Sequence, residues 1–173
     1  MFDAVLYQVE MSRLLRDAAD AVRRHHRGLV IYTVSVWTDP NAAVSAVSVD
    51  TRENSEAQLA ELAAWAQARR AEALAAGDPA MAALLGALPP RNRNPAGFAL
   101  REIASVEHRA FPANWDEVSR GDCWLELGPA LSKVRADAVN QFAGLSLHPE
   151  AELAVNGPRD WYDEPVRLCS RAI

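Results

Sequence analysis

The sequence predicts a single α+β domain over residues 1–173, with a mostly antiparallel sheet and helices packed on one face of it. Two β-rich runs, Leu29–Trp37 and Ala43–Val49, flank Asp39-Pro40-Asn41, whose residue types favour a chain reversal. Segments before and after these runs carry apolar residues at helical spacing. A chain of 173 residues is also long enough to fold as one domain without a metal or a disulfide.

The first helix is predicted from apolar residues that recur every three or four positions, namely Met11, Leu14, Leu15, Ala18 and Val22. The basic run from Arg23 to Arg27, followed by Gly28, is typical of a helix end. His25 and His26 lie within that run, and adjacent helical residues point about 100° apart. We therefore interpret both histidines as part of the helix end and not as ligands of a metal.

Within the second β-rich run, Val47 and Val49 share one face and Ala46 and Ser48 lie on the other. The small and polar character of that second face predicts that it is only lightly covered. The segment Ser55–Gln58 then has the pattern of a capping box. It predicts a helix from there to about Ala76, with an apolar stripe of Leu59, Leu62, Trp65, Ala66 and Leu74.

After Gly77, Asp78-Pro79 predicts a second short helix that reaches Leu88, and Pro89–Pro95 predicts a mobile loop. Further along, the pattern favours a strand at Phe98–Val106, then a helical turn at Pro112–Ser119 with Trp115 and Val118 pointing inward. A helix is expected at Ala130–Phe142, preceded by Gly128-Pro129. The last segment, from Leu145, is expected to be a loop followed by a closing strand at Val166–Cys169.

Composition and charge restrict the possible partners. The formal charge of −5 argues against nucleic acid or an anionic membrane, and is compatible with a basic protein. The first residues do not resemble a signal peptide, and no apolar run is long enough to span a membrane, so we expect a cytoplasmic protein. Cys123 and Cys169 are expected to be reduced, buried thiols. Lys133 is the single lysine, an arginine bias that suggests a bacterial genome.

Motifs of the common enzyme classes are lacking, and the sequence predicts no cofactor and no metal. The pair Glu107-His108 could work as an acid and a base only if a third group orients the imidazole. A nucleophilic role for Cys123 is disfavoured, because Asp122 and Glu126 would raise the pKa of its thiol. Glu107, His108 and Asp122 are the residues from which an alternative enzymatic or ligand-binding site would be assembled.

Acidic residues beside aromatic ones give the strongest indication of a binding surface. Aromatic side chains anchor protein interfaces and charges steer their formation. The alternative is that the tryptophans belong to the core and that the acids form an ordinary solvated face. The candidate contact residues are Asp116, Glu117, Asp122, Asp160, Trp161, Tyr162, Asp163 and Glu164.

The first third of the chain also resembles a bacterial family of unknown function. The features concerned are Ile31-Tyr32, Thr38-Asp39 and the step Asp50-Thr51-Arg52-Glu53 into a helix. Some members are regarded as immunity proteins against polymorphic toxins, and the resemblance implies an α/β or α+β fold and toxin neutralisation. The tryptophan–glutamate motif expected from that family is not recognisable in Arg101–Phe111. The resemblance transfers no catalytic residue.

Two hypotheses of function follow. The first is a non-enzymatic protein-binding module, monomeric or homodimeric, that acts as an immunity protein by binding a basic toxin directly. The second is a small enzyme or ligand-binding domain with a site built from scattered residues.

Overall fold

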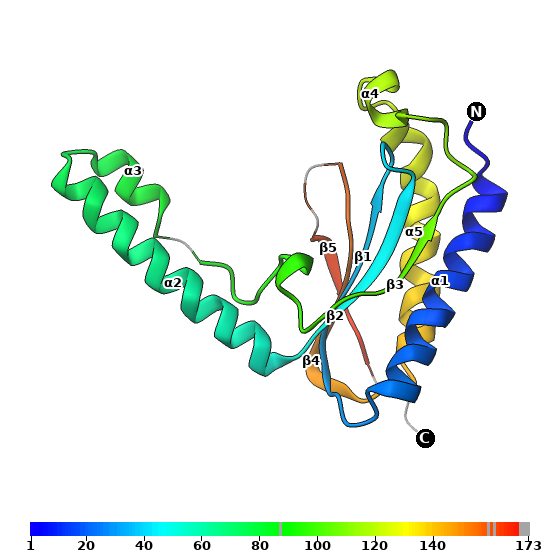
Figure 1. Cartoon of the computed structure of the whole chain (residues 1–173), viewed down its shortest axis with the longest axis horizontal. Helices are drawn as coiled ribbons and strands as arrows, with labels where there is room; N and C mark the ends of the chain where they lie inside the picture. Colours follow the sequence, from blue (N-terminus) through cyan, green and yellow to red (C-terminus); the bar gives the residue numbers. More distant parts are fainter. Residues whose placement is uncertain (87, 159, 161, 170–173) are drawn as a thin grey trace.

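The computed structural model describes residues 1–86, 88–158, 160 and 162–169, and it has the predicted α+β architecture (Figure 1). Its sheet has the order β3-β2-β1-β4-β5, and every neighbouring pair is antiparallel except the parallel pair β1 and β4. The strands are β1 (Ile31–Asp39), β2 (Val44–Asp50), β3 (Leu100–Glu107), β4 (Leu147–Val155) and β5 (Asp163–Arg167). The prediction of a mostly antiparallel sheet is therefore confirmed.

The hairpin of β1 and β2 forms where the two β-rich runs predict it. Val34 pairs with Val49, and Thr38 pairs with Ser45 next to the turn. Val34 and Val49 face the core, whereas Ala46 and Ser48 point to the opposite face, as the alternation requires. Both Ala46 and Ser48 are nevertheless buried, so the prediction of a lightly covered face is wrong.

Strand β4 was not predicted, because its segment was expected to be a loop. The first half of β4 contains Pro149 and two half-buried positions, which hide the alternation that Ala151, Leu153 and Val155 then follow. The predicted closing strand exists as β5, but it begins earlier than expected and ends at Arg167. Cys169 lies beyond β5 and is exposed, which corrects the expectation of a buried thiol.

Two helices, α1 (Ala4–His25) and α5 (Cys123–Phe142), cover one face of the sheet (Figure 1). Their buried side chains, including Leu15 and Phe142, join Val34 and Val47 in one apolar core. Gln8 also donates a hydrogen bond from Nε2 to the carbonyl of Ala130, which links the two helices. Helix α5 begins well before the predicted Ala130, and Pro129 lies inside it.

Helices α2 (Arg52–Ala75) and α3 (Pro79–Leu84) form a hairpin that projects away from the sheet (Figure 1). Thr51 caps α2, since its Oγ1 accepts from the backbone N–H of Asn54, so the predicted capping box at Ser55 is wrong. Of the predicted apolar stripe, only Ala66 is buried, while Trp65 is 53% exposed. The prediction that the helices pack on one face of the sheet therefore holds for α1 and α5, but not for the α2–α3 hairpin. No helix in the described part of the chain is long and apolar enough to cross a membrane.

The segment that returns from the hairpin to β3 is fixed to the sheet by a buried arginine. The Arg91 guanidinium donates to the carbonyls of Tyr32 and Glu150, and its Nε lies 3.2 Å from a carboxylate oxygen of Glu152. It also lies over the Tyr32 ring, 4.1 Å from the ring centroid. The backbone N–H of Asn92 donates to the hydroxyl of Ser55. The expectation that Pro89–Pro95 is mobile is therefore corrected.

A short helix, α4 (Trp115–Ser119), precedes α5 in the place where a helical turn was predicted. Trp115 is buried, and its ring stacks on Phe2, with ring centroids 4.7 Å apart. Val118 is 76% exposed, so only one of the two predicted inward residues points inward.

Candidate functional site

Two of the acidic segments singled out in the sequence meet at one end of the sheet. Strands β1 and β4 run parallel, so their carboxyl ends, near Asp39 and Asn156, lie at the same edge. There, Asp39 and Asn156 line a hollow of about 280 Å³ together with Asp116, Asp160 and Trp124. We call this feature the acidic hollow. Ligands bind beyond the carboxyl ends of parallel strands in many α/β proteins, because the connecting loops diverge at that edge.

Hydrogen bonds hold the walls of the acidic hollow in place. The Asn156 side chain accepts from the backbone N–H of Thr38 and donates to its carbonyl, which joins the ends of β1 and β4. The Asn41 side chain accepts from the backbone N–H of Glu117, which docks α4 on the turn between β1 and β2. The Cys123 thiol donates to Asp116, with Sγ 3.2 Å from Oδ1. Burial raises the pKa of this thiol to about 11, so Cys123 remains protonated and structural.

The other predicted contact residues lie at different distances from this hollow. Glu117 is exposed beside the acidic hollow. Asp163 packs against Gly157, and Gly157 lines the hollow. A Cβ at position 157 would collide with the Asp163 carboxylate, so a larger residue there requires the Asp163 side chain to shift. Asp122 is exposed at the start of α5 and does not line the hollow.

The predicted aromatic anchors do not lie on this surface as expected. Tyr162 is buried, and its hydroxyl donates to Glu152, so this side chain is not available as an exposed contact. Trp161 lies outside the described residues, as does the side chain of Glu164. Trp124 is the aromatic residue that lines the hollow instead. Trp124 lies beside the acidic residues in the sequence, but neither Trp124 nor Asp39 is among the predicted contact residues, because without β4 nothing in the sequence indicates that these segments meet.

The chemistry of the acidic hollow suits a cationic side chain. Asp39, Asp116 and Asp160 line the hollow, and carboxylates can accept charge-assisted hydrogen bonds from an ammonium or a guanidinium group. The indole of Trp124 adds an aromatic face that attracts cations. A group of this kind would be drawn in by charge and then held by directional hydrogen bonds.

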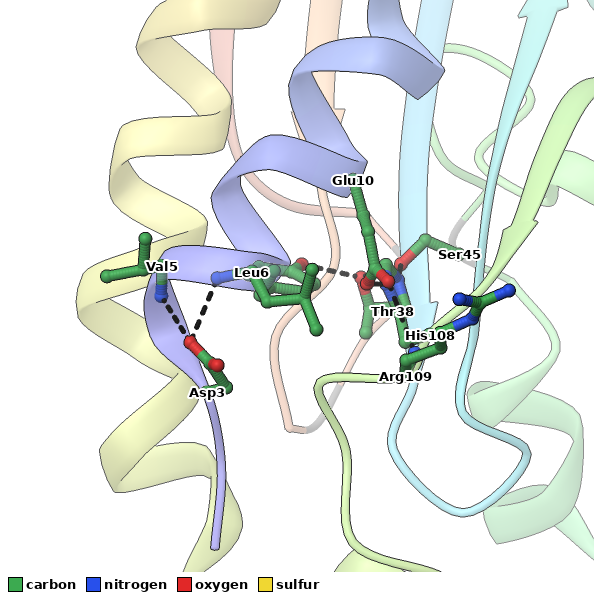
Figure 2. Close-up of polar contacts among 9 residues, drawn as sticks. Asp3, Val5, Leu6, Glu10, Thr38, Ser45, His108 and Arg109 are labelled. Atoms are coloured by element: carbon green, nitrogen blue, oxygen red, sulfur yellow. Dashed lines mark hydrogen bonds and ion pairs between the residues drawn. The ribbon is translucent and has the colours of Figure 1, made fainter.

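The alternative site predicted around His108 has a different geometry, which Figure 2 shows. The Glu10 carboxylate, not Glu107, orients the imidazole, with Oε2 2.8 Å from Nδ1. On the other side, Nε2 of His108 lies 2.7 Å from the hydroxyl of Ser45. Thr38 Oγ1 lies 2.7 Å from the same hydroxyl and 3.1 Å from the hydroxyl of Tyr7. We call these five residues the polar chain.

The order Ser45, His108, Glu10 matches the connectivity of a serine–histidine–acid triad. The accessibility of Ser45, however, does not match that of a catalytic nucleophile. Ser45 and Tyr7 have no exposed surface, and the end of the polar chain that reaches solvent is Glu10, at a hollow of about 550 Å³ between α1 and β3. A substrate would therefore meet the carboxylate first, while the hydroxyl lies deepest. Asp122, the third member of the predicted alternative, is not part of this arrangement.

Among the described residues, no three histidine, cysteine, aspartate or glutamate side chains are grouped so that they could hold a metal ion. Comparison of the chain with family models, curated proteins and solved structures finds no match.

Proposed function

We propose that this chain is a non-enzymatic protein-binding module, and that it acts as an immunity protein that neutralises a basic bacterial toxin by direct binding. The observation that carries the proposal is the acidic hollow. Asp39, Asp116 and Asp160 come from three separate segments and converge beside Trp124 at one edge of the sheet.

The global charge supports the same conclusion. The chain has a formal charge of −5, so its field attracts a basic partner before contact is made. Within the interface, an arginine or lysine of the partner would enter the acidic hollow and pair with the three carboxylates. A toxin that acts on nucleic acid or another anion commonly presents basic side chains at its active site, and these are the groups that such a hollow recognises.

The test requires a defined partner, and the product of the gene adjacent to this one is the first probe. Co-expression of the chain with that product should restore growth if the product is toxic and the chain neutralises it. The double variant Asp116→Lys with Asp160→Lys should lose the protection, because it places two cations where the partner's cation binds. Association should slow, and its dependence on salt should weaken.

The matched control reverses two exposed acids on the projecting hairpin, Glu53→Lys with Glu61→Lys, which changes the net charge equally. This variant should keep the protection, since neither residue lines the acidic hollow. Equal loss in both double variants would assign the effect to net charge alone. Full protection by the variant of Asp116 and Asp160 would contradict the proposed contact. An adjacent product that is neither toxic nor bound would contradict the immunity role.

A further inference from the structure

The direction of every hydrogen bond in the polar chain follows from its two ends. An ionised carboxylate only accepts, so Nδ1 of His108 carries a proton and donates it to Glu10. In a neutral imidazole, Nε2 is then an acceptor, and the Ser45 hydroxyl must donate to it. Because that uses the only proton of Ser45, Thr38 donates to Ser45 and Tyr7 donates to Thr38.

With this polarity each hydroxyl of the polar chain donates one hydrogen bond, although Tyr7 and Ser45 are fully buried. Burial also raises the pKa of Tyr7 to about 12, so its hydroxyl keeps the proton that it donates. The network is complete only while His108 is neutral. It joins α1, through Tyr7 and Glu10, to β1, β2 and the end of β3.

Protonation of His108 reverses the whole arrangement. Both ring nitrogens of an imidazolium donate, so Ser45 must accept from Nε2 and turn its own proton toward Thr38. Thr38 in turn directs its proton to Tyr7, whose hydroxyl lies 3.1 Å from Thr38 Oγ1 and also interacts with the Ser45 hydroxyl. The Tyr7 proton then loses its hydrogen bond to Thr38 and has only the Ser45 hydroxyl, which now accepts from Nε2, as an acceptor, so the network is weaker in the interior.

Charged groups near His108 lie on the solvent side. Glu10 contacts the imidazole from α1, and Arg13 and Asp17 of the same helix line the adjoining hollow. Glu107 and Arg109 flank His108 in the sequence and line the same hollow, and the backbone N–H of Arg109 donates to Glu10. From β1 and β2 the imidazole is approached by the hydroxyls of Thr38 and Ser45. Solvent therefore adjoins the Glu10 side of the ring, whereas the nitrogen that gains a proton, Nε2, faces Ser45.

We infer that the polar chain is a pH-sensitive latch, in which protonation of His108 reverses its hydrogen bonds and loosens the N-terminal half of α1 from the sheet. The same half of α1 carries the contacts that hold the segment after His108. Asp3 donates its backbone N–H to the carbonyl of Ala110, and the Tyr7 ring stacks on Phe111 at 5.3 Å between centroids. Loosening should therefore extend to the segment that leads into α4. The inference does not depend on the proposed function.

The first test is the tautomer of His108 in the folded wild-type protein. Long-range ¹H–¹⁵N NMR spectra at neutral pH should show the Nδ1–H tautomer, since the Glu10 contact requires it. The Nε2–H tautomer would overturn the inference, because Ser45 would then be an acceptor and the polarity would be the opposite one.

The second test follows the melting temperature between about pH 7.5 and about pH 5.5, where histidine titrates and most carboxylates stay ionised. The wild-type melting temperature should fall over this range, and His108→Gln should reduce the fall by more than about 2 °C. The exposed His25 supplies the control, so His25→Gln should keep the wild-type response. An equal fall in His108→Gln and the wild type would overturn the inference.

A third comparison remains decisive if His108→Gln does not fold. Glu10→Gln removes the carboxylate that faces the imidazolium, so its melting temperature should fall more steeply on acidification than that of the wild type. Glu107→Gln removes an exposed carboxylate from the neighbouring residue and should keep the wild-type response. Hydrogen exchange, corrected for its intrinsic pH dependence, should accelerate at acidic pH for amides between Leu6 and Leu14 more than for those of β1. Equal responses of the two glutamine variants, or uniform exchange, would overturn the latch.

Discussion

Replacement of Arg91 by alanine should destabilise the protein far more than the loss of an ordinary surface arginine. The Arg91 side chain is 8% exposed, and its guanidinium joins the segment before β3 to the carbonyls of Tyr32 and Glu150. It also pairs with the Glu152 carboxylate and covers the Tyr32 ring. Alanine would remove all four interactions together.

The magnitude follows from what remains after the substitution. Removal of one partner from a buried ion pair costs about 3–5 kcal/mol, because the other charge stays uncompensated. The Glu152 side chain is 26% exposed and keeps a hydrogen bond from Tyr162, so water can solvate part of the charge. We therefore expect about 3 kcal/mol from Arg91→Ala, at the lower end of that range. For a chain of this size, this corresponds to a fall in melting temperature of about 6–12 °C.

Urea denaturation followed by circular dichroism measures this free energy of unfolding. Arg91→Lys keeps the charge but not the planar fork, so it should lose about half as much stability. Arg69→Ala is the matched control, because Arg69 forms an exposed pair with Glu72 and should cost at most about 0.5 kcal/mol. If the free energies of unfolding of Arg91→Ala and Arg69→Ala differ by less than about 1 kcal/mol, the segment before β3 is not held by Arg91 and the reasoning fails.

Four further outcomes are expected. Tyr32→Ala should cost about 3–5 kcal/mol in urea titrations, since Tyr32 is buried under Arg91; a loss below 1 kcal/mol would contradict its placement. Trp65→Ala should cost about 1 kcal/mol in the same assay, clearly less than Tyr32→Ala, because its side chain is 53% exposed and lines a hollow with Met81 and Leu85. Alkylation followed by mass spectrometry should label exposed Cys169 in the folded protein and buried Cys123 only after unfolding; equal labelling rates would contradict these positions. Burial lowers the pKa of His108 below its ordinary value of 6.5, so around and below that pH the unfolded chain binds more protons than the folded chain, and stability should fall as the pH falls through 6.5; a melting temperature that rises there would show the opposite sign.

Much of the fold could be predicted because local pattern decides it. The hairpin of β1 and β2 follows from β-branched residues on both sides of a turn sequence, and α1 follows from a regular apolar stripe. In α5 the predicted apolar positions Leu131, Val134, Ala138 and Phe142 are all buried. In these segments the preferences of neighbouring residues agree with the packing that the tertiary structure supplies.

The errors occur where distant segments decide the outcome. The Arg91 segment has the composition of a mobile loop, yet a single long side chain reaches two strands and fixes it. The helix α2 has an apolar stripe that predicts burial, but the chain leaves the sheet at Thr51 and most of that stripe, including Leu62, Trp65 and Leu74, is exposed. Neither result can be read from a window of neighbouring residues.

By itself, the sequence determined the α+β class, the central hairpin, the helices α1 and α5 and the acidic character of the chain, because these depend on local periodicity and composition. Only the tertiary structure placed β4 parallel to β1, which brings Asp39 and Asp160 to one edge, and docked α4 on Asn41, which adds Asp116. Likewise, only the packing of α1 on the sheet joins Glu10 to His108, residues 98 positions apart. Contacts at such separations depend on how whole elements pack, and no local preference of the chain encodes them.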